Sequence, residues 1–204
     1  MTNHMMAGLG VFCLMSSTAC AQDNDSAYVT VFESCTQHEA KDEPVWYSDC
    51  AGYDDWTVHI IAGEHGSAVA YSDRGQDIQW RENPPRIGPF QDLGNVMEWR
   101  LNEEGDAFAT IYRTIYSGYD SDQNVDPHEG QYLTVTALRR EGPVGGCHVA
   151  YVEAAQQAGA NQIARDAADM LASDWQCGVE EPYVFDLDSE MDVATLAAQR
   201  MPGH

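Results

Sequence analysis

Segment 147–177, which begins and ends at a cysteine, constrains the fold more than any other part of the chain. Successive residues of a strand point to opposite faces, and in 147–152 both sets are largely apolar, which predicts a strand in the middle of a sheet. Downstream, apolar residues recur at helical spacing and predict a helix with one buried stripe. The stripe comprises Ala160, Ile163, Ala164, Ala167, Met170, Leu171 and Trp175.

The predicted helix has a polar face opposite this stripe, and Asp169 lies on it. Asn161 is expected to cap the first turn with its side chain, and Gly178 is expected to mark the end. With these faces, Met170→Asp should be severely destabilising because it would bury a charge. Asp169→Asn should have little effect.

The first 21 residues have the pattern of a secretory signal peptide. A short apolar stretch, residues 5–19, precedes the small-residue site Ala19-Cys20-Ala21 and a polar run. The stretch is too short to span a bilayer as a retained helix. We therefore expect a periplasmic or secreted protein with no transmembrane segment after processing. A lipid anchor on Cys20 is the alternative.

Removal of the leader leaves four cysteines in a compartment where disulfides form. They are Cys35, Cys50, Cys147 and Cys177. Three connectivities are possible, and we favour Cys35 with Cys50 and Cys147 with Cys177, because each pair brackets a local unit. A zinc site is the less favoured interpretation of these cysteines, because no two of them have the close spacing of a structural zinc site.

The charge of the chain excludes one class of partner. The formal net charge is −23, and Lys41 is the only lysine. Nucleic acids are bound by basic surfaces, so we expect no nucleic-acid partner. An acidic, well-hydrated surface suits an extracytoplasmic domain.

Further strands are indicated by runs rich in β-branched and aromatic residues. These runs are 28–33, 56–61, 67–71, 96–101, 107–116 and 132–139. Residues 63–66 have the glycine content of a hairpin loop, 102–106 form a turn, and 36–49 is expected to be a polar connection.

These patterns predict the α+β class, with a curved, mainly antiparallel sheet and one C-terminal amphipathic helix packed on it. We place a single disulfide-stabilised domain at 22–179. An acidic tail follows at 180–204, with room for a short helix at 193–200.

Four segments together resemble a known family. They are Cys50-Ala51-Gly52-Tyr53, Asn95-Val96-Met97-Glu98-Trp99-Arg100-Leu101, Phe108-Ala109-Thr110-Ile111, and Cys147-His148-Val149-Ala150-Tyr151-Val152 with Cys177-Gly178. The family is an uncharacterised group of small exported alphaproteobacterial proteins with no established activity. The resemblance implies export and a single compact domain, and it assigns no site residue.

A calcium loop is one candidate site. Asp120, Asp122, Asn124 and Asp126 alternate along the chain, as the oxygen ligands of calcium-binding loops do. The pattern then departs from that of an EF hand, because Val125 replaces the glycine of the sharp turn and Gln131 replaces the bidentate glutamate. A solvated hairpin tip explains the same residues. We expect no cofactor other than this calcium ion.

No sequence motif identifies a catalytic centre. The serines form no nucleophile elbow, and His59 and His148 lie inside predicted strands, where a hydrogen-bonded structural role is expected. Two neighbouring carboxylates could still hydrolyse a glycan, because so acidic a chain brings carboxylates together by chance.

A second candidate site is an island of arginine and tryptophan. Arg74, Trp80, Arg81 and Arg86 lie in an irregular segment that Asn83-Pro84-Pro85 stiffens, and Arg100 and Arg113 follow. Guanidinium groups and an indole ring suit a carboxylate or a sugar. The competing interpretation is that these arginines neutralise the protein's own carboxylates.

The sequence therefore favours a non-catalytic binding module, an inhibitor or adaptor of the cell envelope whose partner is a protein or glycan. The alternatives are a calcium-binding surface protein and a hydrolase acting on an envelope glycan or ester.

Overall fold

The structure, a computed structural model, describes residues 24–39, 44–64, 66–73, 86–87, 90–118, 128–141, 145–189 and 191–200. Its elements in chain order are β1 (Asp25–Thr30), the 3-10 helix η1 (Val31–Glu33), β2 (Cys35–Glu39), β3 (Val45–Ala51), β4 (Trp56–Gly63), β5 (Gly66–Asp73), β6 (Phe90–Leu101), β7 (Ala107–Gly118), β8 (His128–Leu138), β9 (Gly146–Glu153), α1 (Ala160–Leu171), β10 (Tyr183–Phe185) and α2 (Val193–Arg200). Among these residues no helix has the length and apolarity needed to cross a bilayer.

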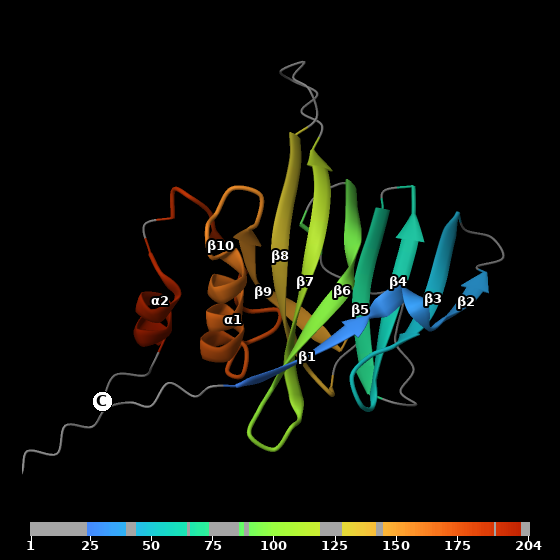
Figure 1. Ribbon diagram of the computed structural model, residues 1–204, viewed down its shortest axis with the longest axis horizontal. Coiled ribbons are helices and arrows are strands. Elements are labelled where there is room, and N and C mark those ends of the chain that lie inside the picture. Colours follow the sequence, from blue (N-terminus) through green and yellow to red (C-terminus); the bar gives the residue numbers. More distant parts are fainter. Residues whose placement is uncertain are drawn as a thin grey trace, which may run out of the picture.

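The strands form one ten-stranded sheet in the order β10-β9-β8-β7-β6-β5-β4-β3-β2, with β1 paired to β6 beside this path. The pairs β10–β9 and β5–β6 are parallel, so the sheet is mixed. Figure 1 shows the long strands β6 to β8 at the centre, with α1 and α2 together at one end. The predicted α+β class is wrong, because most of the described residues lie in strands and the two α-helices are short.

The sequence missed strands at both ends of the chain. Residues 36–49, expected to be a connection, contain most of β2 and β3, which pair antiparallel with Cys35 opposite Cys50. β10 lies in the predicted acidic tail and has only three residues. These strands lack a clear alternation of apolar and polar residues because much of their surface faces solvent, so pattern analysis could not detect them.

The central hairpins were predicted correctly. β4 and β5 pair antiparallel, with His59 opposite Ala70. β6 and β7 are joined by the expected turn, in which the backbone N–H groups of Glu104 and Asp106 donate to Asn102 Oδ1 over 3.1 and 2.8 Å.

The centre of the sheet buries both faces. One face of β7, β8 and β9 packs against the helices through an aliphatic cluster that includes Ile111, Leu133, Val135, Val152, Ala164, Ala167 and Leu171. The opposite face forms a second cluster around Trp99, which is fully buried. The ring of Trp99 lies 6.0 to 6.4 Å from those of Tyr53, Trp56 and Tyr71, so it joins several strands.

A bulge in β9 changes the predicted faces of this strand. Val135 pairs with Ala150, but the next residue of β8, Thr136, pairs with His148, so Val149 is an extra residue. His148 and Tyr151 consequently lie on the same face, where His148 Nδ1 is 2.8 Å from the Tyr151 hydroxyl. Without the bulge, the alternation of side chains along a strand would place His148 and Tyr151 on opposite faces.

Both predicted cysteine pairs form disulfides, Cys35–Cys50 and Cys147–Cys177. The first joins neighbouring strands. The second ties the start of β9 to the segment after α1, and the chain it closes has a sequence separation of 30 residues. Closing a loop of this length stabilises a domain by roughly 3 to 4 kcal/mol if the effect is chain entropy alone.

The predicted buried stripe of α1 is confirmed except at Met170. Its buried residues are Ala160, Ala164, Ala167, Ala168 and Leu171. Met170 is 51% exposed, so it does not belong to the buried stripe. The helix begins after Gly159, whose φ of 80° suits glycine, and no side chain caps it, so the expected Asn161 cap is also wrong. Alanines face the sheet because small side chains allow close approach.

Ion pairs explain the orientation of α1. The Arg100 guanidinium on β6 donates to both carboxylate oxygens of Asp169, over 2.9 and 2.7 Å. One turn earlier in the helix, Arg165 Nε donates to Glu98 Oε1 over 2.7 Å. We call these four residues the helix clamp. Its inner members are nearly enclosed, because the side chains of Arg100 and Glu98 are 6% and 11% exposed.

The strand β1 completes the helix clamp. Arg100 Nη2 also donates to the backbone oxygen of Asn24 over 2.7 Å, and the Ser26 hydroxyl donates to Glu98 Oε1 over 2.6 Å. The pKa of Glu98 is lowered, because hydrogen bonds from Arg165 and Ser26 and the nearby arginine charges outweigh burial, which alone would raise it. The clamp therefore keeps the Glu98 carboxylate ionised at neutral pH.

The helix clamp reverses the expected effects of two substitutions. Asp169→Asn should destabilise the protein by about 3 kcal/mol, because it removes the negative charge that pairs with both ends of the buried Arg100 guanidinium. Met170→Asp should cost less than about 1 kcal/mol, because the side chain at this position is half exposed. Urea unfolding followed by circular dichroism measures both. A larger loss for Met170→Asp than for Asp169→Asn would contradict the observed orientation of α1.

Candidate functional site

Most residues of the two sequence-predicted sites lie outside the described residues. These are Arg74, Trp80 and Arg81 of the arginine and tryptophan island and Asp120, Asp122, Asn124 and Asp126 of the calcium loop. Arg86 is described and exposed. Both site hypotheses therefore remain predictions. Among the described residues, no group of three or more His, Cys, Asp or Glu side chains is placed to hold a metal ion.

The remaining arginines of the predicted island have partners within the protein. Arg100 belongs to the helix clamp, and Arg113 Nη1 donates to Gln131 Oε1 over 2.8 Å. For Arg100, the structure supports the competing interpretation, in which an arginine neutralises one of the protein's own carboxylates.

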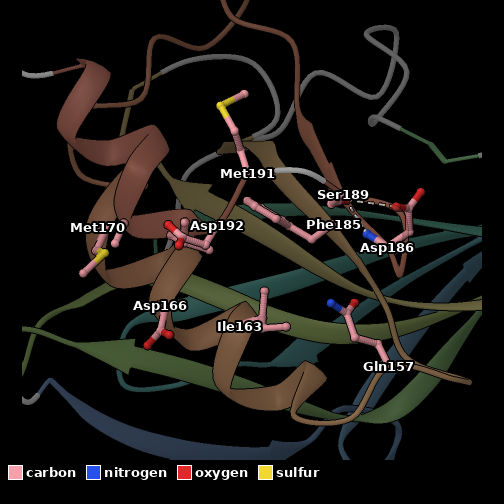
Figure 2. Close-up of a pocket in the computed structure, with 11 residues that line it drawn as sticks. Gln157, Ile163, Asp166, Met170, Phe185, Asp186, Ser189, Met191 and Asp192 are labelled. Carbon is pink, nitrogen blue, oxygen red and sulfur yellow. Dashed lines mark hydrogen bonds between the residues drawn. The ribbon is translucent and has the colours of Figure 1, made fainter.

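A cavity of about 430 Å³ lies between α1, β10 and α2. We call it the C-terminal groove. Its lining residues are Gln157, Ile163, Asp166, Met170, Phe185, Asp186, Ser189, Met191, Asp192, Val193 and Ala194. Figure 2 shows Phe185 and Ile163 near the centre of this view, with Met170 and Met191 toward its outer parts. The volume suits one or two side chains of a partner.

Local structure fixes the walls of the C-terminal groove. Ile163, Asp166 and Met170 are spaced by three and four residues, so they share the side of α1 that lines the groove. Beyond β10, the Ser189 hydroxyl donates to Asp186 Oδ1 over 2.9 Å and closes a turn. Asp192 then accepts from the Thr195 N–H over 2.7 Å, which is the bond of a helix N-cap.

The C-terminal groove is anionic. Asp166, Asp186 and Asp192 line it, and no arginine or lysine is among the described residues that do. The pKa of Asp192 is lowered chiefly by the hydrogen bond from the Thr195 N–H, so this carboxylate is ionised at neutral pH. The Gln157 side-chain oxygen is buried and accepts no hydrogen bond from the described residues. The groove therefore offers acceptors and negative charge.

Apolar side chains are exposed in the same part of the chain. Met170 and Met191, which line the groove, are 51% and 45% exposed. Val179, Val184 and Leu187 also expose more than half of their surface. Two exposed methionines that line one cavity are typical of an interaction site. The groove could not be predicted from the sequence, because Met170 fits a buried stripe by spacing and the segment after residue 179 has the composition of an acidic tail.

A second arrangement lies on one face of β3, β4 and β5. Asp49 Oδ1 is 2.7 Å from His59 Nδ1, and His59 Nε2 is 2.6 Å from the Ser72 hydroxyl. Asp49 Oδ2 is 2.9 Å from His38 Nε2. His59 and Ser72 are buried, at 6% and 3% exposure. Burial lowers the pKa of His59 more than the neighbouring Asp49 carboxylate raises it, so the imidazole is neutral at pH 7.

Sequence spacing could have revealed only half of this arrangement. In the predicted hairpin of β4 and β5, His59 pairs with Ala70, which places Ser72 on the same face as His59. Asp49 joins them through β3, where it pairs directly with His59, and β3 was not predicted.

His148 occupies a third polar cluster, and its role is structural. It is 4% exposed, and its Nε2 lies 3.1 Å from the Tyr112 hydroxyl. Burial lowers the pKa of His148 to about 3. The imidazole is therefore neutral over the physiological range.

Comparison with known proteins finds no protein-family model, no curated protein and no solved structure that matches this chain.

His148 makes stability depend on pH. The unfolded chain takes up a proton on this histidine as the pH falls below about 6.5, whereas the folded protein does not until about pH 3. The free energy of unfolding should therefore fall as the pH is lowered through this window, by at most about 1.4 kcal/mol per pH unit from this group. His148→Gln removes the titration, so its unfolding free energy should fall less steeply between pH 6.5 and 5. Equal slopes in urea titrations would refute a neutral buried His148.

Proposed function

We propose that this chain is an exported, disulfide-bonded binding module that docks a protein segment in the C-terminal groove. The segment presents an apolar side chain flanked by arginine or lysine. The observation that carries this proposal is the lining of the groove, where exposed methionines and a buried phenylalanine lie among three carboxylates with no cationic side chain from the described residues.

The apolar lining supplies the affinity. Methionine side chains are unbranched and polarizable, so they adjust to partners of different shape. Met170 and Met191 are about half exposed, and covering them removes apolar surface from water. The deeper contact is Phe185, which is 3% exposed and forms part of the cluster beneath the helices.

The carboxylates supply the preference for a cation. Asp166 comes from α1, Asp186 from the turn after β10 and Asp192 from the start of α2, so a bound cation would meet negative charge from separate elements. A guanidinium or ammonium group would also supply the donor that Gln157 Oε1 lacks among the described residues. The net charge of −23 would attract a basic partner at long range, with a strong dependence on salt.

The location that we propose is the periplasm or the exterior of the cell. Two disulfides and the finding that no described helix could span a membrane are compatible with it. The leader at 1–21 and the alternative lipid anchor on Cys20 lie outside the described residues. Membership of the small exported alphaproteobacterial family is part of this proposal and rests on sequence resemblance alone.

Fluorescein-labelled peptides test the docking. The panel contains decapeptides with a central leucine or methionine whose flanking residues are arginine, glutamine or glutamate. Fluorescence anisotropy of the mature protein should show binding of the arginine set, weaker binding of the glutamine set and none of the glutamate set. Asp166→Asn should weaken arginine-set binding roughly fivefold, because one charge pair in a partly enclosed site contributes about 1 kcal/mol.

Asp188→Asn is the matched control, because it removes the same charge from an exposed residue outside the lining. It should change binding less than twofold. Equal binding of the arginine and glutamate sets, equal effects of the two substitutions, or no binding by any peptide would refute the proposed docking.

A further inference from the structure

The hydrogen bonds that join Asp49, His59 and Ser72 have a defined direction. An ionised carboxylate only accepts hydrogen bonds, so His59 Nδ1 carries the proton in the 2.7 Å contact with Asp49. In the neutral imidazole the other nitrogen, Nε2, is then an acceptor. The Ser72 hydroxyl therefore donates its proton to His59 over 2.6 Å.

This order of atoms matches that of an activated nucleophile. A serine is activated when a base within hydrogen-bond distance removes its proton and a third group orients the base. Ser–His–Asp sets of this kind occur in unrelated folds and chain orders, so they are recognised from geometry. Here the strand register provides the alignment, because Asp49 pairs with His59 and Ser72 lies diagonally opposite His59 on the next strand.

The surroundings of His59 also suit a general base. His38 holds the second oxygen of Asp49 at 2.9 Å, which fixes the carboxylate from the other side. His59 stays neutral at pH 7 because burial lowers its pKa. A neutral imidazole can accept the serine proton, whereas an imidazolium cannot.

The neighbours of Ser72 define the size of the substrate. Ala68 and Ala70 precede Ser72 on the same face of β5, and they are 1% and 2% exposed. Ser72 itself is 3% exposed, so only a small reagent could reach its hydroxyl. Short methyl side chains beside a nearly enclosed hydroxyl suit a small, uncharged acyl group.

We infer that Ser72 is the nucleophile of a second site, which hydrolyses esters of short-chain carboxylic acids, with His59 as general base and Asp49 as the positioning residue.

The reaction would proceed in two balanced steps. Ser72 Oγ attacks the ester carbonyl carbon while its proton passes to His59 Nε2. The tetrahedral intermediate collapses, the C–O bond to the alcohol breaks, and His59 returns the proton to the departing oxygen. Water, deprotonated by His59, then attacks the acyl-serine and releases the carboxylic acid, and Ser72 recovers its proton.

Covalent labelling of the wild-type mature protein tests this inference without depending on the folding of a variant. A small dialkyl fluorophosphate should add one dialkyl phosphate per chain, and peptide mass spectrometry should place it on Ser72. The labelled protein should lose its hydrolysis of p-nitrophenyl acetate. Absence of labelling on Ser72 in the folded protein would overturn the inference and leave the three residues a structural network.

Variants separate catalysis from structural support. Ser72→Ala should abolish turnover of p-nitrophenyl acetate, and Asp49→Asn should lower kcat at least tenfold and change the pH profile of kcat. Ser67→Ala, a serine on the same strand, should retain wild-type turnover. Turnover that survives Ser72→Ala, or that Ser67→Ala lowers equally, would also overturn the inference.

Discussion

The bidentate ion pair between Arg100 and Asp169 is the interaction on which the C-terminal half of the structure depends. It joins the central strand β6 to α1, and through Asn24 and Ser26 it includes β1. A cation in this nearly enclosed position is tolerable only with its partners in place. The alanine face of α1 fits the sheet closely, and the pair selects the rotation that directs Met170 and Asp166 away from the sheet and into the groove.

Strong local signals made the middle of the fold predictable. The hairpins of β4 with β5 and β6 with β7 follow from apolar and β-branched runs separated by turn residues, and the disulfide pairing follows from local bracketing. The two edge strands of the sheet were not predictable in this way, because β2 is largely exposed and β10 is very short. A bulge at Val149 also shifts the faces of β9, and a strict period of two cannot represent an extra residue.

The candidate sites were less predictable than the fold because each is assembled by tertiary contacts. Met170 fits a buried stripe by spacing, but the pairing of Asp169 with a distant arginine holds the helix in a rotation that leaves Met170 exposed. The contact between His59 and Ser72 follows from the register of a predicted hairpin, but Asp49 needs the strand β3. The calcium loop and most of the arginine and tryptophan island remain sequence-based predictions.

A double-mutant cycle on Arg100 and Asp169 tests the central claim most directly, namely that this pair positions α1. Arg100→Met, Asp169→Leu and the double variant would be unfolded in urea, and the coupling free energy taken from the four stabilities. Each single substitution should cost about 3 to 5 kcal/mol, and the double should cost far less than their sum, so the coupling should exceed about 2 kcal/mol. A coupling below about 0.5 kcal/mol, as at an exposed pair, would contradict the account.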